Sequence, residues 1–362
     1  MKKLNACIIG CVLIILAGCS GSSSGGGYEP IEDVPVVYTA SGLPAPAQSG
    51  VPQPSGTAGN LAVLDWAGFS GAVSYTFDDG QPSHVAHYDE LNDTGVHMTF
   101  FFVSNMVADG AVDTFSQAVA DGHEIGNHTV SHSSVTSSGV LSGASWAPAE
   151  STPQAEMDNC STYITTTFGQ SGVWSMASPF GDPDWVGFAS TSFLLNRQVG
   201  GGTVSPLDST NPLALPSYMA LSSDDANTYV EYINGARDYN AWRIFCFHSI
   251  SPTSDAWYQP VEIEDITYSI RYGKATGDTW IDSLINIGSY WIAQDMFSGI
   301  TPVTVGSDTT WTWTLPDFFP PGKYIRVTVD GGTLSQNGTG LVWDDHGFYE
   351  VSLDEGELTL SP

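Results

Sequence analysis

Cysteine is scarce in this chain: there are five in 362 residues, and three of them fall within the first 19 residues. The other two, Cys160 and Cys246, can form one disulfide at most, so no disulfide framework holds the fold together. The sequence leaves their pairing open. The fold must therefore rest on a hydrophobic core, for which a composition of 41% hydrophobic and 12% aromatic residues is ample.

Basic side chains are few as well. Nine Lys and Arg residues stand against 39 Asp and Glu, which gives a formal net charge of −30. Such a charge argues against nucleic acid, anionic lipid surfaces and polyanionic substrates as direct partners, because like charges repel. It fits a neutral or cationic glycan, and it also fits a protein adapted to a salty medium.

The chain also has no long apolar run. The apolar stretch 4–17 is too short for a comfortable transmembrane helix; it follows a short basic region and predicts a secretory signal peptide over residues 1–18. The tetrapeptide LAGC at 16–19 resembles a bacterial lipobox, which implies that Cys19 is lipidated and becomes the mature N-terminus. Ordinary signal cleavage with a free thiol is the alternative. Ser20 follows, in place of Asp, and by resemblance to Gram-negative lipoprotein sorting this favours the outer membrane, facing the periplasm or the surface.

Composition divides the rest of the chain into three parts. Residues 19–60 are rich in Gly, Ser, Pro and Ala and predict a flexible linker behind the lipid anchor. In 61–298 strand-like and helix-like segments alternate, which predicts an α/β domain with a parallel sheet, closed fully or partly into a barrel. In 299–362 apolar and polar residues alternate between turn signals, which predicts a small all-β, sandwich-like domain. Its aromatic residues fit the core of that domain better than a sugar-binding face. They are Trp311, Trp313, Trp343 and Tyr349.

Polar segments follow several of the predicted strands, at the strand ends where barrels of this kind carry their chemistry. They are TFDDG (76–80), NHTVSH (127–132), SPFGD (178–182) and FCFHS (245–249). Asp-Asp-Gly by itself can be a simple turn. His128 and His132, four residues apart, can present two imidazoles to one ion if the segment coils there. With them, one Asp offers an oxygen ligand and the other can act as a base, so the segments together predict a divalent metal site.

Three of these motifs, TFDDG, GHEIGNHTVSH (122–132) and IFCFHS (244–249), resemble the polysaccharide deacetylases of carbohydrate esterase family 4, the NodB-homology family. The resemblance covers roughly residues 61–297. It implies a distorted (β/α) barrel that removes acetyl groups from glycans with one divalent metal ion, usually zinc, with cobalt or nickel as other possibilities.

The resemblance also implies roles for individual residues. Asp79, His128 and His132 would hold the metal. Asp78 would be the general base, and His248 would be the general acid that protonates the leaving group. The backbone N–H of Phe180 would stabilise the oxyanion, a kind of preorganised interaction that supplies much of an enzyme's rate enhancement. Three neighbours of Phe180 are expected to line the substrate groove: Pro179, Asp182 and Trp185.

The sequence departs from the family at its third motif. Many members carry Arg-x-Pro-Tyr there, with the Arg orienting the catalytic Asp, whereas this chain has Ala177 at the Arg position and Phe180 at the Tyr position. The group that orients Asp78 is therefore open. Arg197 could substitute, or it could be an ordinary solvated or salt-bridged arginine. The remaining histidines carry less weight: His84 and His87 are expected at the surface, and His97 and His346 in structural roles.

Two functions remain in competition. The first is a metal-dependent deacetylase, acting as a monomer on an N-acetylated glycan such as chitin or peptidoglycan, or on O-acetylated xylan. The second is a catalytically silent glycan-binding lipoprotein, suggested by the missing Arg and the aromatic C-terminal segment. A serine esterase is disfavoured, because no Gly-x-Ser-x-Gly elbow accompanies Ser74, Ser104 or Ser131.

Overall fold

The computed structural model describes residues 28–143, 148–252, 255 and 257–362. The signal peptide predicted over 1–18 and the lipidation predicted at Cys19 lie outside the described residues. The chain forms two units, Met1–Pro30 and Ile31–Pro362, and the structure described below is that of the second. Among the described residues, no helix combines the length and the apolar character that crossing a membrane requires.

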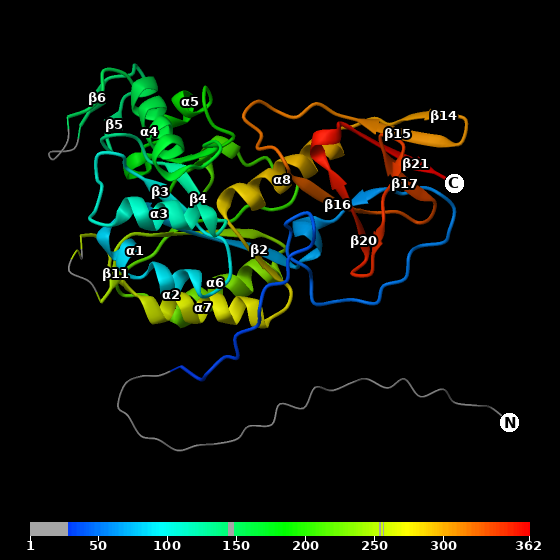
Figure 1. Ribbon diagram of the computed structural model, residues 1–362, viewed down its shortest axis with the longest axis horizontal. Helices are drawn as coiled ribbons and strands as arrows, with labels where there is room; N and C mark the ends of the chain where they lie inside the picture. The colour runs from blue at the N-terminus through cyan, green and yellow to red at the C-terminus, as the bar shows by residue number, and fades with distance from the viewer. Residues whose placement is uncertain (1–27, 144–147, 253–254, 256) are drawn as a thin grey trace. The chain divides into compact units, whose positions relative to one another are not determined.

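An eight-stranded parallel sheet organises the larger part of the chain (Figure 1). Its order is β8-β7-β4-β3-β2-β10-β9. The eighth strand, β13, pairs with the first residues of β2, whereas β3 pairs with the last ones. The strands are β2 (Gly71–Asp79), β3 (Thr99–Phe102), β4 (Glu124–Asn127), β7 (Ser175–Ala177), β8 (Leu195–Arg197), β9 (Tyr218–Met219), β10 (Trp242–Phe247) and β13 (Thr279–Ile281). Strands and helices alternate as predicted, and the distorted, open (β/α) barrel is confirmed.

Helices flank this sheet. They are α1 (Pro82–Ala86), α2 (Tyr88–Asn92), α3 (Ala111–Ala120), α4 (Pro153–Phe168), α5 (Trp185–Ala189), α6 (Ala226–Asp238), α7 (Ile263–Ala275) and α8 (Leu284–Ser298). Short strand pairs in the connections are β5 (Ser134–Val135) with β6 (Leu141–Ser142), and β11 (Ile250–Ser251) with β12 (Val261–Glu262).

The central strand β2 is buried along almost its whole length because both of its faces are covered, as is usual in parallel sheets. Val73, Tyr75 and Phe77 are fully buried in one core cluster, whereas Ala72 belongs to another. The register aligns Phe77 with Phe247 of β10 and Asp78 with Phe101 of β3. The carboxyl ends of these strands therefore meet at the same edge, where the polar segments follow.

The C-terminal part is all-β and forms two antiparallel sheets. One has the order β1-β16-β20-β19 and the other β14-β15-β21-β17-β18. The strands are β1 (Ala62–Val63), β14 (Val303–Val305), β15 (Asp308–Thr312), β16 (Tyr324–Thr328), β17 (Thr333–Gln336), β18 (Thr339–Gly340), β19 (Trp343–Asp344), β20 (Phe348–Ser352) and β21 (Glu357–Ser361). Because β1 comes from the segment before the barrel, the predicted boundaries at residues 61 and 299 do not separate two independently packed domains. One hydrophobic cluster includes Ile287 of α8 and Val327 of β16.

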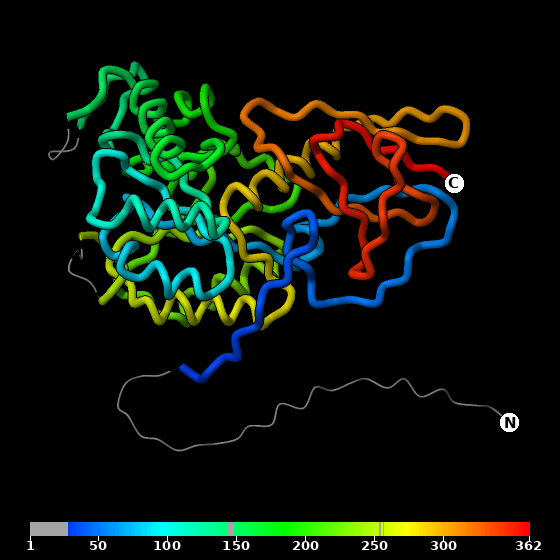
Figure 2. Tube along the Cα trace, viewed as in Figure 1, coloured from blue at the N-terminus to red at the C-terminus, as the bar shows by residue number. Residues whose placement is uncertain are grey.

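The segment 31–60 is not the flexible linker that its composition predicts. Leu43 is buried, and the Lys274 ammonium lies 2.6 Å from the Asp33 carboxylate. Figure 2 shows this segment as the blue trace, part of which runs beside the red C-terminal strands, where Gln53 Nε2 donates to Tyr349 Oη at 2.8 Å. The prediction is wrong because richness in Pro, Gly and Ser reports the absence of regular secondary structure, whereas an irregular segment can still pack through its backbone groups.

Arg326 of β16 connects the segment 31–60, the residues just before β2 and the strand β20. Its buried guanidinium donates to the carbonyl oxygens of Pro44 (2.7 Å) and Ala67 (3.0 Å) and to Glu350 Oε1 (3.0 Å). It also lies 4.0 Å from the centre of the Phe348 ring. A buried charge with this many partners stabilises the fold only while all of them are present.

We expect Arg326→Ala to lower the free energy of unfolding by about 3–5 kcal/mol, because it leaves the Glu350 carboxylate without its positively charged partner and two carbonyl groups without this donor. Urea unfolding followed by tryptophan fluorescence measures this change. Glu231→Gln, at an exposed position of α6, is the control and should stay within about 0.5 kcal/mol of the unsubstituted protein. Equal stability of the two variants would contradict the assigned role of Arg326.

Candidate metal centre and active site

The two adjacent carboxylates lie at the carboxyl end of β2, where the backbone turns sharply. Asp79 has φ of 79° and Gly80 has φ of 69°, both in the left-handed region. A Cβ atom on Gly80 would lie 2.4 Å from the Phe102 ring, so only glycine fits there. The turn therefore forms part of the site, because it directs Asp78 and Asp79 to the same region at the carboxyl end of the sheet.

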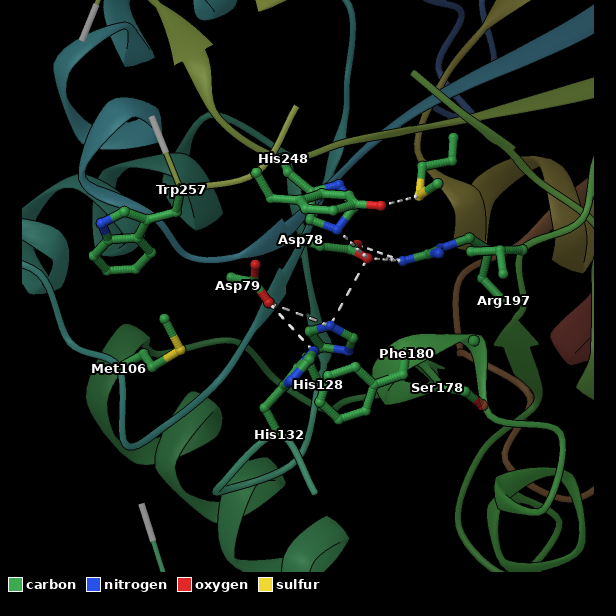
Figure 3. A pocket seen from close by; sticks show the side chains of 14 residues that line it. Asp78, Asp79, Met106, His128, His132, Ser178, Phe180, Arg197, His248 and Trp257 are labelled. Carbon is green, nitrogen blue, oxygen red and sulfur yellow. Dashed lines mark hydrogen bonds and ion pairs between the residues drawn. The ribbon is translucent and has the colours of Figure 1, made fainter. Parts of the chain in front are cut away.

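Asp79, His128 and His132 converge as the sequence predicts (Figure 3). Asp79 Oδ1 lies 3.5 Å from His128 Nε2 and 3.6 Å from His132 Nε2. Two ligand atoms that are each about 2.1 Å from one tetrahedrally coordinated zinc ion lie roughly 3.4 Å apart. The segment between the histidines is a loop rather than a helix, with left-handed φ values of 67° at Thr129 and 52° at His132.

The protonation of His128 supports a cation at this position. Its Nδ1 lies 2.8 Å from the Ala177 carbonyl oxygen, to which it donates. Burial lowers the pKa of His128 to about 3, so the ring is neutral and its Nε2 carries a lone pair. A lone pair that faces the Asp79 carboxylate is unfavourable unless a cation lies between them. The donor set, one carboxylate and two imidazoles, suits zinc and related divalent ions.

Asp78 is held by a buried ion pair. The Arg197 guanidinium, at the end of β8, donates to both carboxylate oxygens of Asp78. Cys246 of β10 places its Sγ 3.5 Å from Asp78 Oδ2. Burial alone would raise the pKa of Asp78, but the Arg197 charge, aided by nearby His128 and His248, lowers it well below the usual range. Arg197 therefore lies where the sequence left the orienting group open.

His248 also reaches the site. Its Nε2 lies 3.9 Å from Asp78 Oδ2, and its ring meets the Tyr258 ring edge-on at 4.8 Å. Its buried Nδ1 has no hydrogen-bond partner among the residues that the structure describes. His84 Nε2 donates to the His248 carbonyl oxygen at 2.7 Å.

The expectation that His84 and His87 are surface residues is wrong. His84 is fully buried and His87 is nearly so. His84 closes the capping box of α1 by accepting from the Gln81 N–H, and His87 Nε2 bonds the Pro252 carbonyl at 3.0 Å. A helix this short, packed beneath the loop after β10, has little outward face left.

A cavity of about 540 Å³ opens over these groups. Apart from the residues above, its lining is mostly apolar or aromatic. These other residues are Met106, Ser178, Phe180, Gly181, Val199, Met219, Trp257 and Tyr258. Phe180 has φ of 59°, and its exposed ring lies 4.4 Å from the His132 ring, at the rim of the cavity.

The other three predicted groove residues do not line this cavity. Trp185 is fully buried, where its Nε1 donates to the Ser133 carbonyl oxygen. Pro179 is buried as well. The Asp182 carboxylate accepts from the backbone N–H groups of Val135 and Asp184 and so shapes the loop. Pro179 and Trp185 lie close to Phe180 in the sequence, but the tight turn at this point directs their side chains into the protein.

Sequence reasoning missed two residues at this site. Gln81 Nε2 donates to Asp79 Oδ2 at 2.9 Å, and Gln81 Oε1 accepts from the Ser249 hydroxyl at 2.7 Å. Trp257 lines the cavity and is 57% exposed. The position of Gln81 directly after the Asp-Asp-Gly turn was a usable signal, whereas nothing in the sequence around Trp257 connects it with the site.

Comparison with known proteins finds one matching family model. Residues 70–192 match the family model described as polysaccharide deacetylase. Over these residues the chain is similar to polysaccharide deacetylases. The strands that bear Arg197 and His248 lie beyond the match but continue the same sheet. No curated protein matches the chain.

Several solved structures are similar to it. A family 4 acetyl xylan esterase from Clostridium thermocellum, in complex with a cobalt ion, is 23% identical with a TM-score of 0.40, over 60% of this chain and 89% of that one. A family 4 carbohydrate esterase from Bacillus anthracis is 15% identical with a TM-score of 0.39, over 66% and 87%. A family 4 pseudoenzyme from Bacillus anthracis is 14% identical with a TM-score of 0.39, over 64% and 68%.

We expect the protein to bind one Zn²⁺ or Co²⁺ ion through Asp79, His128 and His132. A metal ion at 100 times its dissociation constant should stabilise the metal-free protein by about 2.7 kcal/mol, seen as a rise in Tm. Asp79→Ala should abolish the rise. Asp344→Ala is the matched control, because it removes a carboxylate from the separate Asp344–His346 cluster; loss of the rise in this variant alone would place the metal elsewhere.

Proposed function

We propose that the protein hydrolyses acetyl groups on a glycan in a metal-dependent reaction. One observation carries the proposal: Asp79, His128 and His132 converge beside Asp78 and His248 at one mouth of a polysaccharide deacetylase domain. A metal site, a base and an acid thus lie within reach of one small acyl group.

A divalent cation held by Asp79, His128 and His132, most simply zinc with cobalt or nickel as alternatives, would polarise the acyl carbonyl and acidify the attacking water. Asp78 takes the proton from that water as it attacks. Arg197 Nη2 donates to both oxygens of Asp78, which fixes the direction of the carboxylate and keeps it ionised, as a base requires. His248 Nε2 gives a proton to the departing sugar nitrogen or oxygen, and the backbone N–H of Phe180 donates to the oxyanion.

The cavity supports a neutral glycan as the substrate. Its one cationic side chain among the lining residues, Arg197, is engaged with Asp78 and cannot pair with an anionic sugar. Trp257 and Phe180 expose 57% and 64% of their surface at the rim, and flat rings of this kind pack against the apolar faces of sugars. The same machinery serves an N-acetyl glycan, such as chitin or peptidoglycan, and an O-acetyl glycan such as xylan.

A catalytically silent, glycan-binding protein is the second candidate. The observation in its favour is the buried Nδ1 of His248, which lacks a hydrogen-bond partner among the described residues. Without a partner at Nδ1, no described residue selects the tautomer of the ring that an acid catalyst needs. Glycan binding without acetate release, in protein loaded with Zn²⁺ or Co²⁺, would identify this function.

Acetate release from chitooligosaccharides, peptidoglycan and acetylxylan tests the catalytic proposal. Metal-loaded protein should release acetate from at least one of them, and chelation should stop it. Asp78→Asn keeps the shape but removes the base, so kcat should fall by about 10²–10⁴-fold. Asp344→Asn should leave kcat unchanged. Full activity of Asp78→Asn would contradict the role of Asp78 as the base.

We also propose that Cys19 is lipidated and anchors the chain to the outer membrane. The LAGC sequence behind an apolar stretch and the glycine- and serine-rich residues 20–27 support this. In a Gram-negative host, the protein should incorporate labelled palmitate and fractionate with the outer membrane, whereas Cys19→Ala should do neither. Unlabelled protein that is released as a soluble form would indicate ordinary signal cleavage.

A further inference from the structure

Glu156 lies behind the loop that carries both histidine ligands and is completely buried. It belongs to the first turn of α4, where the N-terminal end of the helix favours a negative charge. The mechanism proposed above makes no use of this carboxylate.

The two Glu156 oxygens together accept four short hydrogen bonds. Oε2 accepts from the backbone N–H groups of Val130 (2.8 Å) and Ser131 (2.9 Å). Oε1 accepts from the Ser131 hydroxyl (2.5 Å) and from the Glu150 N–H (2.8 Å). Ser133 Oγ lies farther away, at 3.5 Å. Val130 and Ser131 lie between His128 and His132, so the carboxylate holds the middle of the ligand loop.

This loop needs such support because its backbone is strained. Thr129 and His132 both have left-handed φ values, which cost of order 1 kcal/mol or more for residues other than glycine. The Thr129 hydroxyl accepts from the His132 N–H at 3.0 Å, but this bond acts only within the loop. Asn127 joins the beginning of the loop to α4, since it donates to the Met157 carbonyl and accepts from the Thr129 N–H. Glu156 joins the middle of the loop to the same helix.

We propose that Glu156 is a positioning residue for the metal centre: it holds the loop in the conformation that aims the two imidazoles at Asp79. The inference rests on the metal site of the proposed function and not on the catalytic step. Groups that orient metal ligands typically contribute 10–100-fold to metal affinity. Glu156→Gln keeps the size of the side chain but replaces one acceptor oxygen by an NH₂ donor that faces N–H or O–H groups.

Co²⁺ titration of the metal-free protein tests this, with the visible spectrum of the bound ion as the readout. Glu156→Gln should weaken Co²⁺ binding by about 10–100-fold and alter the spectrum. Glu124→Gln is the matched control, since Glu124 is a buried carboxylate on β4 that accepts from Thr99, Ser175 and Ile285 and does not bond the loop. It should reduce stability while leaving affinity and spectrum unchanged.

Unchanged binding by Glu156→Gln, or an equal loss in both variants, would overturn the proposal, because the effect would then be absent or due to general destabilisation. If Glu156→Gln does not fold, Ser131→Ala removes one bond to the carboxylate and should still weaken Co²⁺ binding several-fold; unchanged affinity there would overturn it too. The titration uses no glycan. A protein that binds Co²⁺ as expected but releases no acetate would therefore contradict the proposed function and leave this inference standing.

Discussion

The buried ion pair between Asp78 and Arg197 is the interaction on which the site depends. It removes two charges from water, a cost that is offset only because the guanidinium contacts both carboxylate oxygens. With Asp78 held ionised, the neighbouring Asp79 lies beside a fixed negative charge in a buried place, and burial together with that charge raises the pKa of Asp79. A cation among Asp79, His128 and His132 balances this arrangement, so the ion pair and the metal site complement each other electrically.

Several side chains at the cavity are positioned by unusual backbone conformations, and other parts of the chain hold these conformations in place. Asp79, Thr129, His132 and Phe180 all have positive φ, and each of them stands at the cavity or next to a metal ligand. Strained residues of this kind persist only where their surroundings hold them. Gly80 allows the β2 turn against Phe102, and the Glu156 carboxylate supports the histidine loop. Four of the twelve described non-glycine residues with positive φ therefore lie at or beside the site, and Gly80 and Glu156 support the two turns that carry the metal ligands.

The C-terminal strands connect with the site through α8. This helix shares a hydrophobic cluster with Ile325 and Val327 of β16 on one side. On its other side a Cβ atom at Gly288 would lie 2.4 Å from the Leu195 side chain, so α8 packs closely on β8, the strand that ends in Arg197. The β layer is therefore part of the support for the arginine that orients Asp78, which explains why it does not pack as a separate domain.

The sequence alone determined the open barrel, the ends of its strands and the residues that meet there, because apolar periodicity and motif spacing are properties of neighbours along the chain. Only the tertiary structure decided that Arg197 takes the place of the arginine missing at Ala177, since its partner Asp78 is 119 residues away and the order of the strands brings them together. The same holds for Trp185 and His84, which lie next to functional motifs but face inward, and for residues 31–60. Whether a side chain points into a cavity or a core depends on what packs against it, and that information is distributed over the whole chain.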